Sequence, residues 1–164
     1  MTTRRVAYCA MLTALAMIFG YVEAFIPFGF GIPGVKLGVA NIVIVLALYK
    51  LPLYQTAIIQ IMRIVLVSFL FGNMSMMIYS LAGGLFSLLV MYVLKKMNCF
   101  SIAGVSIAGG VSHNVGQLAV AVLVVQNLKI AFYLPVLLIA GIVTGCLIGI
   151  LAYKMKPVLD KLDV

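Results

Sequence analysis

Acidic residues are the scarcest class of charged side chain in this sequence. Its 164 residues include three of them, Glu23, Asp160 and Asp163, and charged residues of both signs make up only 9% of the chain. Hydrophobic residues make up 66%, whereas soluble domains are about 45–50% apolar. A surface with so little charge is unsuited to water. The composition therefore predicts a protein whose solvent is lipid, and it leaves no room for a soluble domain.

Two further absences limit what the protein does. The sequence contains no GxxxxGK[ST] phosphate-binding loop, so we expect that the chain does not hydrolyse ATP itself. Ion-driven carriers use carboxylates inside the membrane as relays, and Glu23 is the only such carboxylate here. No spacing of cysteine or histidine resembles a metal site. We therefore predict a protein that is no enzyme and no self-powered pump, with neither cofactor nor metal ion.

Long apolar runs divide the chain into six predicted transmembrane helices. A helix needs about 20 apolar residues to cross a bilayer, and polar or Gly/Pro-containing turns interrupt the runs. The predicted spans are residues 6–26, 37–51, 54–71, 74–94, 102–125 and 131–153. The second span is short, so either the loop before it enters the membrane or neighbouring helices bury its end. The sequence thus predicts one all-α transmembrane domain over residues 1–164.

The positively charged residues predict the orientation of this bundle. An even number of spans places both termini on one side of the membrane. Cytoplasmic loops carry an excess of Lys and Arg, so we predict that both termini are cytoplasmic. The charges lie at the ends of apolar runs and not along one face, which argues against a nucleic-acid partner. Eight basic residues share the side of the termini, namely Arg4, Arg5, Lys50, Lys95, Lys96, Lys154, Lys156 and Lys161, and the opposite side has Lys36 and Lys129.

A group of polar residues falls at the middle or in the outer half of the predicted spans. Ionisable groups are costly inside a membrane and are therefore functional candidates. The spacing of His113, Asn114 and Gln117 places them on one helix face, and the planar fork of Arg63 suits a carboxylate or phosphate. We predict an outward-open cavity that binds a small anionic, partly apolar solute. The predicted site residues are Glu23, Lys36, Asn41, Arg63, His113, Asn114 and Gln117.

Each of these residues also has a purely structural interpretation. Glu23 and Arg63 could pair with each other, with Glu23 otherwise orienting a cation or the ligand. His113 and Asn114 could form hydrogen bonds between helices, and Lys36 could extend to the lipid head groups. Aromatic residues at a similar depth could face the ligand or form an interfacial belt; they are Tyr21, Phe25, Phe28, Phe30 and Tyr79.

Small residues four apart let helix backbones approach closely. The first span carries Ala10 and Ala14, and the last carries Gly141, Gly145 and then Gly149. Such patterns serve either packing within the chain or docking of another membrane subunit, and the sequence alone leaves both interpretations open.

The size, the topology and the Ala10/Ala14 pair resemble the substrate-capture (S) components of energy-coupling factor vitamin transporters. The whole chain more closely resembles a bacterial family labelled "Gx transporter" or "heptaprenyl diphosphate synthase component I". The stretches that carry this second resemblance are residues 33–41, Arg63 with Phe71 and Gly72, residues 80–84 and residues 104–117.

The first resemblance implies a membrane subunit of an ATP-driven vitamin or cofactor-precursor uptake transporter, located in the bacterial inner membrane. Its Ala10/Ala14 face would dock a coupling transmembrane subunit that carries two ATPases. The second label implies a synthase, but prenyl-chain elongation needs Mg²⁺ held by clustered carboxylates, and Asp160 and Asp163 stand alone. A non-catalytic accessory subunit of heptaprenyl diphosphate synthase is the alternative. A homo-oligomeric channel is disfavoured because the polar cluster stops at mid-depth.

Overall fold

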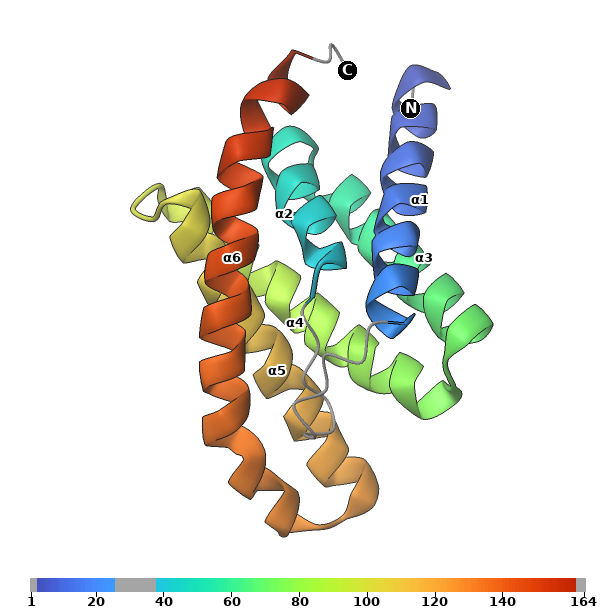
Figure 1. Ribbon diagram of the computed structural model, residues 1–164, viewed down its shortest axis with the longest axis vertical. Helices are drawn as coiled ribbons and strands as arrows, with labels where there is room; N and C mark the ends of the chain where they lie inside the picture. The colour runs from blue at the N-terminus through green and yellow to red at the C-terminus, as the bar shows by residue number, and fades with distance from the viewer. Residues whose placement is uncertain (1–2, 26–37, 162–164) are drawn as a thin grey trace.

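The chain is an all-helical bundle (Figure 1). The computed structural model describes residues 3–25 and 38–161, and the side chains of all of these except residues 23–25, 159 and 160. These residues contain no strand. The elements are α1 (Thr3–Phe25), α2 (Ala40–Lys50), α3 (Leu53–Phe71), α4 (Met74–Met97), α5 (Ile102–Val125), the 3-10 helix η1 (Leu128–Tyr133) and α6 (Leu134–Asp160).

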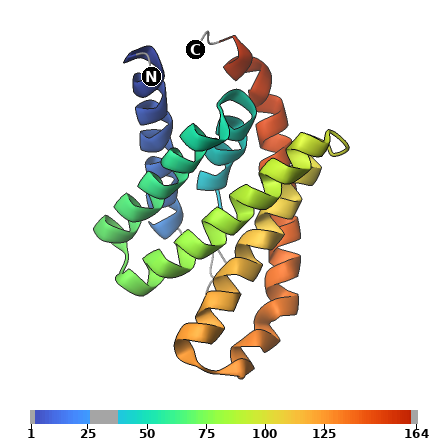
Figure 2. The same cartoon turned by 180° about the vertical axis from the view of Figure 1, so that it is seen from behind.

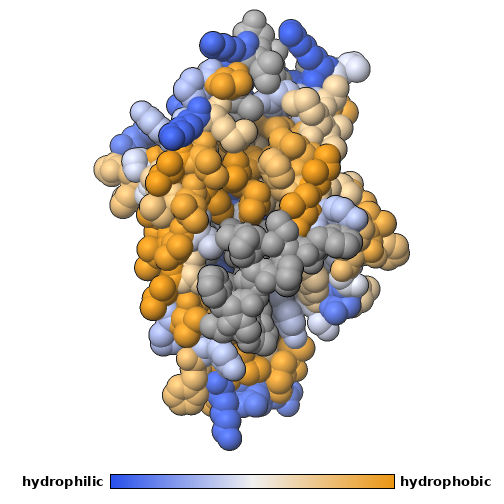
Figure 3. Space-filling model, in the orientation of Figure 1, coloured by the Kyte–Doolittle hydropathy of each residue, from blue (hydrophilic) through white to orange (hydrophobic). Residues whose placement is uncertain are grey.

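The surface of this bundle is apolar around its middle. Large hydrophobic side chains are exposed on the long helices, for example Phe69 at 85% and Leu123 at 74% of their full accessible area. Figure 3 shows hydrophobic side chains over the central part of the molecule and hydrophilic ones gathered at its two ends. Five segments are long and apolar enough to cross a membrane. The prediction of a multi-pass, all-α membrane protein is therefore confirmed.

Helix α2 is much shorter than the other five α-helices. It has 11 residues, which is about 16 Å at 1.5 Å per residue and about half of a bilayer's hydrocarbon core. It packs against α1, α3 and α6, and every side chain from Ile42 to Leu48 is buried. The sequence left two explanations for the short second span: a preceding loop that enters the membrane, or burial by neighbouring helices. Within the described residues, neighbouring helices bury it. Gly38, whose φ of 68° is left-handed, and Pro52 lie on either side of it.

Several helix boundaries follow local signals in the sequence. The Asn73 side chain caps α4 by accepting a hydrogen bond from the Met76 amide at 2.8 Å, and Ser101 caps α5 by accepting from the Gly104 amide at 3.1 Å. Asn98 ends α4 in the left-handed conformation. The last predicted span, 131–153, lies within the apolar segment Leu128–Val158, which begins with η1 and continues as α6.

Helices α4 and α6 both pack along α5, and within the described ranges they hardly touch each other. Figures 1 and 2 show that the start of α1 and the end of α6 lie at one end of the molecule, whereas the α5–α6 connection lies at the other. This arrangement leaves α2 in the middle of the bundle, with its N-terminus pointing away from the end at which α1 begins (Figure 1).

Candidate functional site

Five of the seven predicted site residues line a single cavity of about 110 Å³. All six α-helices contribute to its walls, so no pair of helices forms it alone. The Glu23 side chain and the whole of Lys36 lie outside the described residues. The residues that the cavity brings together are Asn41 from α2, Arg63 from α3, and His113, Asn114 and Gln117 from α5.

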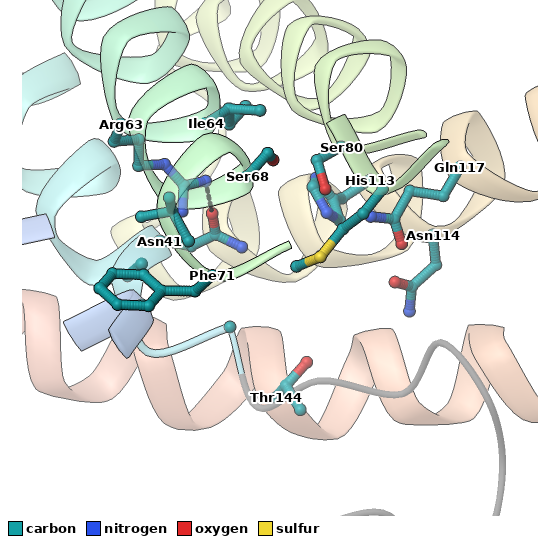
Figure 4. Close-up of a pocket in the computed structure, with 16 residues that line it drawn as sticks. Asn41, Arg63, Ile64, Ser68, Phe71, Ser80, His113, Asn114, Gln117 and Thr144 are labelled. Atoms are coloured by element: carbon teal, nitrogen blue, oxygen red, sulfur yellow. Dashed lines mark hydrogen bonds between the residues drawn. The ribbon is translucent and has the colours of Figure 1, made fainter. Parts of the chain in front are cut away.

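Arg63 is held in place by two amide side chains. Its Nε donates a hydrogen bond to Gln60 Oε1 at 2.8 Å. Its Nη2 donates a hydrogen bond to Asn41 Oδ1 at 2.8 Å (Figure 4). Gln60 lies one turn earlier on α3 and is only 1% exposed, so it fixes the guanidinium from the protein side. Two bonds from different helices set the plane of the guanidinium, which is the feature that makes arginine selective for planar oxyanions.

The N-terminus of α2 adds to the positive potential of the cavity. Gly38, Ala40 and Asn41 all line it, so the first turn of α2 borders the same space as Arg63. The N-cap residue of α2, Val39, makes no side-chain capping hydrogen bond, and the N-terminal end of a helix carries a partial positive charge. The described lining contains Arg63 and no acidic residue. The cavity is therefore suited to an anionic group.

The opposite wall comes from α5. Figure 4 shows His113, Asn114 and Gln117 together with Ser80 on one side, and Arg63 with Asn41 and Phe71 on the other. Asn114 Nδ2 donates a hydrogen bond to the Leu137 carbonyl of α6 at 2.7 Å. Asn114 therefore forms a hydrogen bond between helices, as its structural interpretation predicted. It also lines the cavity.

A glycine lets α4 approach this wall. A Cβ at Gly83 would lie 2.6 Å from both the His113 carbonyl oxygen and Gln117 Cγ, far closer than carbon atoms tolerate. Hence only glycine allows α4 to pack at this distance beside two of the candidate residues.

Four polar residues around the site were not predicted. Ser68, Ser80 and Thr144 line the cavity, and Gln60 supports Arg63. Helical spacing could have found Gln60, because it lies three residues before Arg63 and so shares its face. Nothing in the sequence places Ser80 or Thr144 at the same cavity as Arg63, because that placement depends on how separate helices pack.

The two small-residue patterns have different surroundings. Ala10 and Ala14 are exposed on the outer surface of α1. Gly145, in contrast, faces α5, where a Cβ would lie 2.6 Å from Ile107 Cα. The α6 glycines therefore pack within this chain.

The aromatic residues do not behave as one group. The Tyr21 and Phe71 rings lie 4.8 Å apart with an interplanar angle of 56°, and Phe71 also lines the cavity. Tyr79 lines a second cavity nearby. Phe25, Phe28 and Phe30 lie outside the part of the chain whose side chains the structure describes.

Comparison with known proteins gives one match. The model of a family described as heptaprenyl diphosphate synthase component I matches residues 12–155. No curated protein and no solved structure matches the chain. Within the described residues, no three or more His, Cys, Asp or Glu side chains are grouped as metal ligands would be.

Proposed function

The chain belongs to the heptaprenyl diphosphate synthase component I family, and from this premise we propose that it is a non-catalytic membrane subunit that captures a small anionic, partly apolar solute. The anionic group of the solute occupies the cavity around Arg63. The observation that carries this proposal is the arrangement of Arg63, which Gln60 and Asn41 hold at the edge of a cavity beside the α2 N-terminus.

The energetics of a membrane charge support a ligand role for Arg63. An arginine near the centre of a membrane helix costs roughly 2.5–3.5 kcal/mol on translocon scales. An anionic solute would offset part of this cost, because its full negative charge is attracted to the guanidinium and can accept charge-assisted hydrogen bonds from it.

The proposed subunit takes up its solute from outside the cell and depends on a partner for energy. The positive-inside distribution of Lys and Arg predicts that the termini are cytoplasmic, and with that orientation the cavity belongs to the outer half of the bundle. Release is driven by a coupling transmembrane subunit with two ATPases, as the resemblance to S components implies. Its docking surface is the exposed α1 face around Ala10 and Ala14.

A second candidate function follows from the printed description of the family. The chain would then be an accessory membrane subunit of heptaprenyl diphosphate synthase, and the same cavity would hold the anionic end of an isoprenoid substrate or product. The two functions differ in the partner. Purification from native membranes should recover an ATPase-containing module in the first case and a catalytic prenyltransferase component in the second.

The test of the site is the substitution Arg63→Gln. Loss of one charge-assisted hydrogen bond of about 1.5–3 kcal/mol should weaken solute affinity about 10- to 150-fold. Native mass spectrometry of the purified protein identifies the bound solute, and its affinity is then measured by thermal shift. Lys129→Gln is the matched control, because it removes an exposed cation on the same predicted side and should leave affinity unchanged.

Pairing between Arg63 and Glu23 is the competing explanation, and a double variant separates the two. If the arginine serves only that pair, Arg63→Gln leaves a carboxylate alone in the membrane and lowers stability. Adding Glu23→Gln would then restore stability, with solute affinity unchanged throughout. That result would remove Arg63 from the binding site.

A further inference from the structure

A second cavity of about 590 Å³ adjoins the one around Arg63. The two share three lining residues, Met76, Ser80 and Gln117. The second lies in the groove that α4 and η1–α6 form over α5, two walls that both pack on α5 and hardly touch each other within the described ranges.

One face of α5 forms the floor of both cavities. Its residues follow the spacing i, i+3, i+4, i+7, i+8 and i+11, which is one continuous stripe of a helix. The stripe changes character along its length, because its middle is polar and its far end is apolar. In order, it consists of Gly110, His113, Asn114, Gln117, Leu118 and Ala121.

The volumes of the two cavities indicate which part of a ligand each could hold. Ligand sites for drug-sized molecules are about 300–1,000 Å³. A cavity of about 110 Å³ therefore has room for one anionic group and not for a whole solute. The adjoining cavity is large enough for the rest, and the groove that holds it is lined by apolar side chains such as Tyr79, Leu118 and Leu137.

We propose that the two cavities form one bipartite site for an amphiphile, whose anionic head binds at Arg63 and whose apolar body lies in the groove along α5 as far as Ala121. This inference rests on the proposed function and specifies its substrate class. The ligand is a free solute and not a membrane phospholipid. The head cavity is lined by residues from all six helices, whereas a phospholipid keeps its head group at the membrane surface.

The test uses the full chain in lipid nanodiscs with butyl, hexyl, octyl and decyl phosphate as probes, each compared with the alcohol of equal length. The affinity for each phosphate, referred to its free aqueous concentration, should rise roughly fourfold per added methylene. Arg63→Gln should weaken the binding of all four phosphates and leave the alcohols unaffected. Phosphatidylglycerol in the nanodisc should not displace butyl phosphate, and displacement would show that a lipid head group competes for the site.

Ala121→Trp tests the groove by filling its end, and Ala119→Trp on the exposed face of the same helix is the matched control. Ala121→Trp should weaken decyl phosphate at least about tenfold and change butyl phosphate less than about twofold. Ala119→Trp should change neither. Ala121→Phe serves as a smaller block if the tryptophan variant does not fold, as judged by gel filtration.

The outcomes distinguish a failure of the bipartite site from a failure of the proposed function on which it rests. If affinity depends on Arg63 but not on chain length, or if the two tryptophan variants behave alike, the bipartite site is wrong and the anion site stands. If no phosphate binds saturably and Arg63→Gln has no effect, the proposed function itself fails.

Discussion

At the scale of single residues, the site depends on how Arg63 is oriented. The guanidinium is fixed by Asn41 from α2 and Gln60 from its own helix, each at 2.8 Å. Gln60 is in turn accommodated by Gly84 of α4, where a Cβ would lie 2.6 Å from Gln60 Nε2. A chain of contacts across three helices therefore sets the direction of one charged side chain.

We expect Gln60→Met to weaken anion binding although Arg63 remains. The loss of one orienting hydrogen bond, about 0.5–1.5 kcal/mol, corresponds to about a 2- to 10-fold loss of affinity. Gln55→Met is the matched control, because Gln55 is a buried amide of the same helix whose Nε2 bonds to Tyr54 Oη at 2.8 Å instead. Affinities by thermal shift should separate the two variants even if both lose similar stability. Equal effects on affinity would assign Gln60 a structural role only.

At the scale of elements, close packing between α5 and α6 shapes the bundle. Gly110 and Gly141 face each other so closely that a Cβ on Gly141 would lie 3.0 Å from the Gly110 carbonyl carbon. One turn further along α6, Gly145 contacts the backbone at Ser106 and Ile107. The α5 face that carries His113 and Asn114 is therefore positioned by backbone contact and not by long side chains.

Gly145→Ala should destabilise the protein. Its Cβ would lie 2.6 Å from Ile107 Cα and 2.8 Å from the Ser106 carbonyl oxygen, so the backbones must separate, at a cost of about 1–3 kcal/mol for overpacking. In Gly104→Ala the new Cβ would lie 3.6 Å from its nearest neighbour, Ser101 Oγ, and little change is expected. Thermal unfolding in detergent compares the two variants. Equal midpoints would mean that the seam between α5 and α6 relaxes freely.

At the scale of the whole molecule, the orientation in the membrane decides from which side the cavity fills. The start of α1 and the end of α6 lie at one end of the bundle (Figures 1 and 2), which is the arrangement that six spans would give. Charge placement then predicts that this end is cytoplasmic.

Cys99 provides a native probe of this orientation, because it is exposed in the connection between α4 and α5. With Cys9 and Cys146 replaced by serine, Cys99 should resist an impermeant maleimide in intact cells and react after lysis. In a cysteine-free chain, Lys129→Cys in η1 should react in intact cells. The reverse pattern would place the cavity on the cytoplasmic side.

Substitutions on the exposed face of α1 test whether a coupling subunit docks there. Ala10→Trp together with Ala14→Trp should leave folding and solute affinity unchanged, because both side chains are exposed, but should abolish co-purification with a coupling subunit. Ala119→Trp, exposed on α5, controls for bulk added to a lipid-facing surface. Survival of co-purification in the double variant would remove this face from the docking interface.

The sequence by itself determined the class of protein, because a bilayer imposes rules that can be read residue by residue. Apolar runs of about 20 residues and the turns between them located the long helices. The cost of polar groups in lipid identified Arg63, His113, Asn114 and Gln117, and the family resemblance added Asn41. The fold brings these five residues to one cavity.

Only the tertiary structure decided how these residues are combined. The bonds of Arg63 to Asn41 and of Asn114 to Leu137 join residues 22 and 23 positions apart, and such contacts depend on packing between helices. Burial of α2, the contribution of Ser80 and Thr144, and the second cavity along α5 arise in the same way. The cost of placing polar groups in lipid determines which segments cross the membrane, and this cost can be read from the sequence. Close packing between helix backbones determines which side chains come into contact, and this packing is visible only in the tertiary structure.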